Sequence, residues 1–399
     1  MSAPTRIYQQ LEAQIKHYAP ELRITSGRRL AVLALGILGS EHCTLRRVAH
    51  EVAAMGVSRA QPESIARRLR RTVADLRLDA GAGYAALVAE AITWPQTTPV
   101  LLVLDESTTP GGLHLLRLSL AYRSSCLPLS WAVWPHQAKL PPGAYWRHLD
   151  GVVARAKAML SEEVRVVVLA DRAYDVPPLL DRLTALGWDW IIRVKARSKL
   201  VWRDDAGAEQ PLCTLVATAL TQPGTRLRAT GEAFKKAGWR AVHLVGEWGH
   251  GYAEPLVVVT SLAPRWSVLS RYARRFWIEA AFRQDKSQGW DWAHSQIRHP
   301  QHQERLLLAL AWATLLILSL GAQQAAAAGT RRAHRRPRSQ PTHPRDSLFT
   351  LGLRRFRAWL YGTVRGRLRW RLPRVTAPSW CTEWLAAHHA QVQAQSVLP

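Results

Sequence analysis

The sequence predicts an α/β protein, in which helices flank a mixed β-sheet that a β-rich insertion interrupts and a helical N-terminal domain precedes. Three observations support this prediction. Residues 1–95 show the apolar spacing of helices, whereas short apolar runs typical of strands begin at residue 100. Three such runs are then followed by alternating helical and strand-like segments, an order typical of mixed sheets covered by helices.

The composition indicates a globular chain with a polyanionic partner. Its 399 residues, 48% hydrophobic and 21% charged, suffice for two or more domains. A net charge of +25 favours nucleic acid as the partner. The cysteines form no CxxC pair, which argues against a zinc site or a disulfide framework and fits a reducing cytosol. The N-terminus has no signal-peptide pattern. These cysteines are Cys43, Cys126, Cys213 and Cys381.

The helical segment 1–95 contains a candidate DNA-binding element. Residues 44–71 predict two helices joined at 56–58, with Thr44 as the cap of the first. This resembles a helix-turn-helix, whose second helix enters the major groove of DNA. A plain helical bundle with a solvated basic face is the alternative. The second helix carries Arg67, Arg68, Arg70 and Arg71.

The segments that follow have the order of a known sheet architecture. We predict strands at 100–104, 114–123, 127–135, 164–170 and 189–194, and helices at 148–160 and 177–186. This order is the core of the ribonuclease-H-like fold. We assign its first part to 98–196 and its second part to 257–325.

Residues 197–256 interrupt the alternation and predict the β-rich insertion. We expect short strands at 212–217, 225–230 and 239–247, without a helix, before the chain returns to the main sheet at 256–261. An apolar helix follows at 304–325. Its uncharged stretch 306–322 reaches the low end of the length of a membrane span, but a buried core helix is the favoured interpretation and no membrane partner is expected.

The last segment, 326–399, predicts a basic tail. Its stretch 329–346 is rich in Arg, Pro, His and Ser and is typical of a flexible linker. The stretch 348–371 mixes arginines with aromatic residues, a composition that suits contact with nucleic acid. A solvated or poorly ordered tail is the alternative.

Three carboxylates form a candidate metal site. Asp105 and Asp171 end two apolar strands that neighbour each other in the predicted fold, and Glu279 follows the insertion. Oxygen ligands suit Mg²⁺ or Mn²⁺, and two such ions support phosphoryl transfer. Either Asp taken alone would more often be a turn or cap residue. Glu106 would point to the opposite face of its strand and is excluded as a ligand.

The glutamate lies in a segment, 271–289, that predicts a helix with a polar face. At ~100° per residue, Tyr272, Arg275, Glu279 and Lys286 fall within one narrow arc of this helix. Such a set of side chains is not typical of a buried stripe.

These residues resemble the signature of one family. The ordered set Asp105, Asp171 and Glu279 is similar to the DDE triad of insertion-sequence transposases. Residues 170–174, Ala-Asp-Arg-Ala-Tyr, resemble the family's second-aspartate motif, although related chains often have Gly at the position of Ala173. The spacing of the polar face matches the Y-R-E-K signature of the group with a β-strand insertion.

The resemblance implies the roles of the residues and the reaction. It implies nicking at transposon ends and strand transfer into target DNA, with the three carboxylates holding Mg²⁺ or Mn²⁺ and a homodimer acting in the DNA complex. It also implies DNA contacts by Tyr272, Arg275 and Lys286. Arg172 is a weaker candidate that could instead form a surface ion pair, and Trp290 could receive a flipped base or simply be buried. The alternatives for the whole chain are a catalytically silent DNA-binding derivative, a ribonuclease-H-like nuclease and a membrane-associated basic protein.

Overall fold

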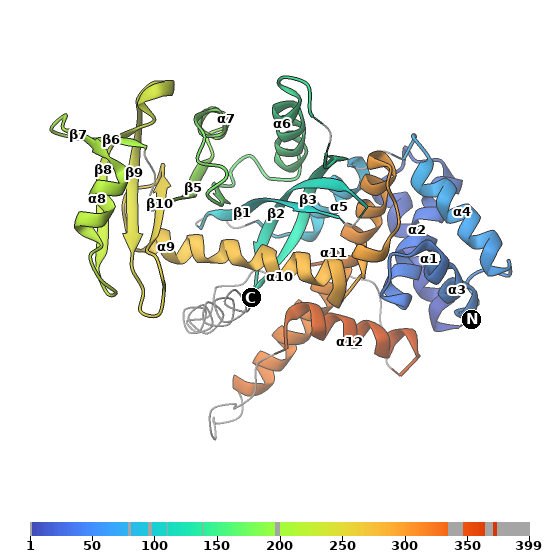
Figure 1. The fold of residues 1–399 in the computed structure, drawn as a ribbon. Coiled ribbons are helices and arrows are strands. Elements are labelled where there is room, and N and C mark those ends of the chain that lie inside the picture. Colours follow the sequence, from blue (N-terminus) through green and yellow to red (C-terminus); the bar gives the residue numbers. More distant parts are fainter. Residues whose placement is uncertain are drawn as a thin grey trace. The chain divides into compact units, whose positions relative to one another are not determined.

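The computed structural model describes residues 2–78, 81–94, 98–109, 111–137, 139–195, 200–333, 346–363 and 370–372 (Figure 1). By its internal contacts the chain forms two compact units. The first unit draws on Met1–Trp94, Glu106–Glu162 and Trp277–Arg374, and the second on Pro95–Asp105 and Glu163–Phe276. Parts of the predicted flexible linker and most of the predicted basic tail lie outside the described residues.

The first unit begins with a group of helices: α1 (Ala3–Tyr18), α2 (Ile24–Ser40), α3 (Leu45–Ala54), α4 (Pro62–Ala74) and α5 (Ala82–Ala91). Helix α2 is buried along most of its length and packs against α1, α3 and the long helix α11 (Pro300–Ala333). Helices α3 and α4 are the pair predicted from the sequence. The connection between them turns at Gly56, whose φ of +66° favours glycine. The four arginines of α4 are all exposed.

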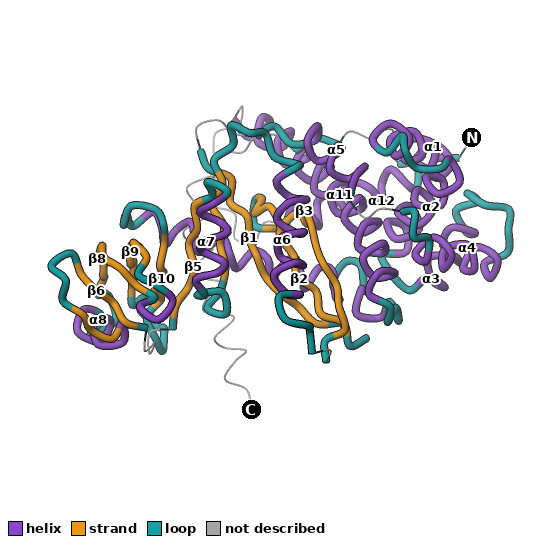
Figure 2. Tube along the Cα trace, turned by 90° about the horizontal axis from the view of Figure 1, so that it is seen from above, coloured by secondary structure: helices purple, strands orange, loops and turns teal. Residues whose placement is uncertain are grey.

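The same unit contains the hairpin of β2 (Leu113–Tyr122) and β3 (Ser125–Pro135). Its two-residue turn, Arg123 and Ser124, has positive φ at both positions, as the twist of a tight hairpin requires. Helix α6 (Ala144–Lys157) covers one face of the hairpin, and α10 (Trp277–Arg283) with α11 covers the other (Figures 1 and 2).

The apolar helix α11 is a core helix that α12 (Leu348–Leu360) crosses closely. A Cβ added at Gly352 would lie 1.8 Å from the carbonyl oxygen of Ile317, so only glycine permits this approach. Within the described residues, Pro300–Ala327 is long and apolar enough to cross a membrane, and 94% of its apolar window is buried inside the protein. That burial favours the core helix, because the core helices of globular proteins pass the same test of length and composition.

The aromatic residues of the predicted basic tail belong largely to this core. Phe349, Phe356, Trp359 and Trp370 are all buried, whereas Tyr361 is 73% exposed. The four buried rings cover α11 and its neighbours and present little surface to a ligand. Their arginine-rich sequence context gave no sign of this burial.

The second unit contains a mixed sheet. Strands β1 (Val100–Thr108), β4 (Val166–Ala170) and β5 (Asp189–Val194) are parallel, and β10 (Leu256–Thr260) pairs antiparallel with β5. Strand β1 belongs to this unit as far as Asp105 and then continues into the first unit. Helix α7 (Pro177–Ala185) packs on β5.

The insertion extends this sheet. Strand β9 (Arg240–Glu247) pairs with β10, and β8 (Arg226–Ala233), β6 (Val201–Asp204) and β7 (Glu209–Pro211) follow in that order. The expected strand at 212–217 is wrong, because this segment is helix α8 (Leu212–Ala219). Its buried Leu212 and Val216 are four residues apart, which is the spacing of one helix face.

The strand order confirms the fold class. The hydrogen-bonded order begins β3-β2-β1-β4-β5, with the connections predicted for a ribonuclease-H-like sheet, and the insertion strands follow β10. The fold is therefore a ribonuclease-H-like mixed sheet flanked by helices, interrupted by a β-rich insertion and preceded by helices.

Candidate active site

Two of the predicted carboxylates converge at one edge of the second unit's sheet. Asp105 is the sixth residue of β1, and Asp171 directly follows β4. The parallel register pairs Val103 with Leu169, so Asp105 lies level with Asp171 at the end of β4. The expected end of the first strand at residue 104 was wrong, because β1 continues past Asp105 to Thr108. Asp105 is 9% exposed, and Asp171 is half-buried.

Both carboxylates face the same guanidinium group. The Nη2 of Arg275 donates a hydrogen bond of 3.1 Å to Oδ2 of Asp105 and lies 3.7 Å from Oδ2 of Asp171. One positive group thus faces two negative ones at a largely buried point, which leaves an excess of negative charge there. Carboxylate oxygens that converge on one cation are a suitable donor set for a hard divalent ion such as Mg²⁺ or Mn²⁺.

The turn after β4 fixes the orientation of Asp171. Its Oδ1 accepts a hydrogen bond of 2.8 Å from the backbone N–H of Ala173, an interaction typical of Asp in turns. The Ala at this position, where related chains often have Gly, therefore supports the turn through its backbone. Arg172 is exposed and lies 3.8 Å from Glu254, so the structure places it in a surface ion pair.

Asp175 is a neighbouring carboxyl group that the sequence analysis missed. Burial raises the pKa of Asp175 to about 6, Lys195 and a backbone hydrogen bond oppose this shift, and the negative charge of Asp171 adds to it. A second Asp four residues after Asp171, in the run Asp-Arg-Ala-Tyr-Asp, was the available signal.

The raised pKa of Asp175 predicts a pH-dependent stability. Between pH 3.8 and about 6 the folded protein keeps a proton that the unfolded chain has released. In metal-free buffer, we therefore expect this group's contribution to the free energy of unfolding to fall as the pH rises through that window. Urea unfolding at several pH values should show a weaker fall in Asp175→Asn. The exposed Asp205→Asn serves as the control, and equal pH profiles in the two variants would contradict the prediction.

The segment that carries Glu279 is not the uniform α-helix that the sequence predicted. It consists of α9 (Ser267–Tyr272), a 3₁₀ segment (Ala273–Phe276), α10 and a π-helical segment (Gln284–Gln288). These changes of winding rotate its side chains away from the positions that ~100° per residue gives. The prediction of one continuous α-helix over 271–289 was therefore wrong, because the segment changes between α-helical, 3₁₀ and π-helical turns.

The four polar residues of this segment differ in burial. Tyr272 is 1% exposed, and burial raises the pKa of its hydroxyl. Glu279 is half-buried in α10, which belongs to the first unit. In the part of the chain that the structure describes, no three His, Cys, Asp or Glu side chains are gathered so that they could hold a metal ion. The structure thus gathers Asp105 with Asp171, and the place of Glu279 in the set stays a prediction.

A buried ion pair lies beside Lys286. Asp285, in the π-helical segment, pairs with Arg117 of β2, and the guanidinium of Arg117 lies 4.1 Å from the centre of the Phe282 ring. Burial raises the pKa of Asp285 against the opposing effect of Arg117. Lys286 is half-buried, and its pKa is lowered by burial and by the charge of Arg117, while Asp285 opposes this shift.

Trp290 is a core residue in this structure. It is 0% exposed, its Nε1 donates a hydrogen bond of 3.0 Å to Oγ1 of Thr314, and its ring meets the ring of Phe349 edge to face. Neither face of the indole is accessible for stacking on a base. Its predicted contact with DNA would require the ring to leave this site.

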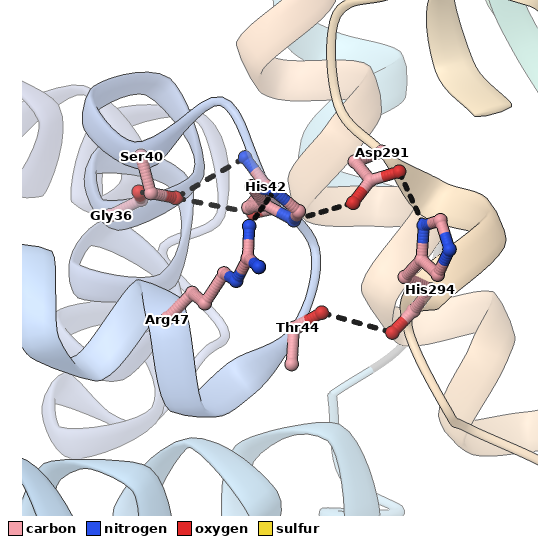
Figure 3. A network of polar contacts seen from close by, with 7 residues as sticks. All are labelled: Gly36, Ser40, His42, Thr44, Arg47, Asp291 and His294. Atoms are coloured by element: carbon pink, nitrogen blue, oxygen red, sulfur yellow. Dashed lines mark hydrogen bonds and ion pairs between the residues drawn. The ribbon is translucent and has the colours of Figure 1, made fainter. Parts of the chain in front are cut away.

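The loop after Trp290 is tied to the N-terminal helices of the same unit (Figure 3). The carboxylate of Asp291 lies 2.8 Å from Nδ1 of His42 and 2.6 Å from Nδ1 of His294, both at ion-pair distance. Thr44 donates a hydrogen bond of 2.9 Å to the carbonyl oxygen of His294 and makes no side-chain cap on α3, contrary to the expected cap. The loop therefore holds the α2–α3 connection through several polar contacts.

Comparisons with known proteins give a family match and several similar solved structures. Residues 147–316 match the family described as Transposase DDE domain, a span that includes Asp171 and Glu279 and begins after Asp105. No curated protein matches the chain. The chain is similar to a cryo-EM structure of the piggyBac transposase synaptic complex with hairpin DNA, at 10% identity and a TM-score of 0.42, over 96% of this chain and 82% of that chain.

The residues that match the family lie in the predicted catalytic domain and its insertion. The matched span contains β4, β5, β10 and α10, which are elements of the predicted catalytic domain. Over residues 147–316 the chain is therefore similar to the transposase DDE domain family.

Proposed function

We propose that this chain is the transposase of an insertion sequence, which cleaves DNA at transposon ends and transfers the strands into target DNA with the help of divalent metal ions. The convergence of Asp105 and Asp171 on one positive group carries the proposal. The DDE family match and the net charge of +25 support it. The Y-R-E-K spacing further favours the insertion-sequence group with a β-strand insertion.

The carboxylates have the central role in this proposal. Asp105, Asp171 and Glu279 would hold Mg²⁺ or Mn²⁺. When bound, two such ions activate the attacking oxygen and stabilise the leaving oxygen of a phosphodiester. Burial of Asp105 excludes water from one side of the site and strengthens its electrostatic interactions.

Arg275 links the carboxylates to the DNA. Its guanidinium lies close to both aspartates in this structure and offsets part of their negative charge. With Asp105 and Asp171 holding a divalent cation instead, the guanidinium would no longer be needed at these oxygens. Arg275 would then be free to bind the phosphate next to the reacting one, as the Y-R-E-K resemblance implies. Lys286, and less directly Tyr272, Arg172 and Trp290, remain proposed DNA contacts.

The proposal includes the wider organisation of the chain. Residues 1–95 would bind DNA through α3 and α4, whose exposed arginines suit a phosphate backbone. The catalytic domain would comprise 98–196 and 257–325, with the insertion at 197–256 and the basic tail at 326–399. A homodimer would hold the two transposon ends, in the bacterial cytosol.

A cleavage assay on the element's own ends tests this function. The DNA that flanks the gene supplies the substrate, and the assay contains Mn²⁺ or Mg²⁺. We expect nicking at the ends and joining of those ends to a second DNA, and we expect EDTA to stop both reactions. Hydrolysis without joining would indicate a nuclease instead. Binding of the ends without any cleavage would indicate a catalytically silent DNA-binding protein.

A further inference from the structure

Several residues predicted to contact DNA are buried in the structure. Exposed arginine and lysine side chains elsewhere are therefore better placed to contact the phosphates of DNA. Tyr272 is 1% exposed and Trp290 is 0% exposed, while Arg275 is paired with two carboxylates. In the second unit, several arginines surround the start of α9. We call this group the α9 arginine surface: Arg165, Arg226, Arg228, Arg265, Trp266 and Arg271.

Trp266 orders one side of this surface. It is 36% exposed and directly precedes α9. Arg226 and Arg228 are two residues apart on β8 and share one face of the strand. Their guanidinium carbons lie 5.2 Å and 4.6 Å from the centre of the indole ring, within the range of a cation–π contact. One aromatic ring therefore holds two positive groups side by side.

On the side of the surface near Trp266, the arginines outnumber the carboxylates that pair with them. Glu247 lies 3.1 Å from Arg226 and compensates it. Arg228 is exposed and has no carboxylate at ion-pair distance in the part of the chain that the structure describes. One positive charge on this side is therefore not balanced, and an anion from outside would offset it.

The other side of the surface has the same imbalance. Burial lowers the pKa of Arg271, and the nearby charges of Arg165, Arg274 and Arg265 lower it further, while Asp189 opposes the shift. Asp189 lies 4.0 Å from Arg165, and its other oxygen accepts a hydrogen bond of 2.9 Å from Ser261. Arg265 is exposed and, within the described residues, lacks a carboxylate partner.

We propose that the α9 arginine surface binds the phosphate backbone of duplex DNA, which rests on the proposed transposase function and adds a phosphate-binding site to it. Arginine suits this ligand because its planar group forms paired hydrogen bonds with phosphate oxygens. Phosphate contacts position a protein on DNA without reading its sequence. The site therefore positions the DNA near α9, whichever sequence the transposon ends have.

Salt-dependent DNA binding tests this proposal. The double variant Arg228→Gln/Arg265→Gln removes two exposed charges. Lys157→Gln/Lys236→Gln is the control, because it removes two exposed charges that lie outside the surface. Binding to a duplex of arbitrary sequence is measured by fluorescence anisotropy over a range of salt concentrations. We expect the slope of log K against log[salt] to become shallower by about 0.9 for each lost phosphate contact.

The outcomes separate this inference from the proposed function. A weaker affinity and a shallower salt slope in the arginine variant, with the lysine variant close to the unmodified protein, would support the inference. Equal affinities and slopes in the two variants would overturn it. If the unmodified protein does not bind duplex DNA, the proposed transposase function itself fails. Because a general loss of folding lowers the active fraction without changing the salt slope, the slope distinguishes a phosphate contact from a structural effect.

Discussion

Replacement of Asp171 by Asn is expected to abolish metal-dependent DNA cleavage while DNA binding is retained. The carboxylate lies at the end of β4 beside Asp105, and one oxygen of each carboxylate faces the guanidinium of Arg275. Asn removes the negative charge and keeps the shape and one oxygen of the side chain. Loss of an outer-shell partner of a metal already costs about 10–100-fold, so loss of a direct ligand should lower the cleavage rate by more than about 100-fold.

The neighbouring carboxylate Glu106 provides the control for this prediction. It follows Asp105 on β1, and its Oε1 accepts a hydrogen bond of 2.7 Å from the Tyr145 hydroxyl, while its Oε2 pairs with His114. We expect Glu106→Gln to cleave the transposon ends at close to the unmodified rate. Cleavage rates and DNA affinities of both variants are measured on the same substrate. Cleavage by Asp171→Asn at the unmodified rate would show that Asp171 holds no metal.

The sequence predicted the sheet of this protein well because buried strands are apolar and short. The predicted strand at 189–194 coincides with β5, and those at 164–170 and 256–261 differ from β4 and β10 only at their ends. Asp105 and Asp171 could be placed together from the sequence because their strands are parallel neighbours, although β1 does not end at Asp105 as predicted but continues to Thr108. That inference needed only strand order and the rule of alternating side chains.

Other features depend on contacts that the local pattern does not contain. The segment at 212–219 carries Val and Thr residues that favour strands, yet its buried positions recur every four residues. The aromatic rings of Trp290 and Phe349 lie against each other although they are far apart in the chain. The local sequence does not distinguish a tryptophan that stacks on a base from one that fills a core. Only the tertiary contacts show which role the residue has.

The buried pair of Arg117 and Asp285 had no signal in the sequence. An arginine in the middle of a predicted strand is expected to point to solvent, yet Arg117 is 1% exposed and Asp285 is 6% exposed. The pair connects β2 to the π-helical segment that carries Lys286. It therefore fixes the position of that segment against the hairpin by a charge contact as well as by packing.

Removal of one partner of this pair should destabilise the protein strongly. Asp285→Ala leaves the guanidinium of Arg117 without its counter-charge at a site that water does not reach. Breaking a buried ion pair in this way costs about 3–5 kcal/mol. We expect a fall of several degrees in the melting temperature, measured by circular dichroism.

A double variant separates the charge from the packing. In Arg117→Leu/Asp285→Leu both charges are replaced by apolar groups, and such replacements are often neutral or stabilising. We therefore expect the double variant to recover most of the stability lost in Asp285→Ala. If the double variant is as unstable as the single one, packing at this site matters more than the charge pair.

The single variant Arg117→Leu tests the same pair through pH. Without Arg117, the buried carboxylate of Asp285 loses the positive charge that opposes the rise of its pKa, so that pKa should rise further. A folded-state pKa above the unfolded value means that the folded protein binds more protons, so the variant should lose stability as the pH rises. Its melting temperature should therefore approach that of the unmodified protein at acidic pH and fall below it at neutral pH. A difference that is the same at every pH would show that Asp285 carries no buried charge.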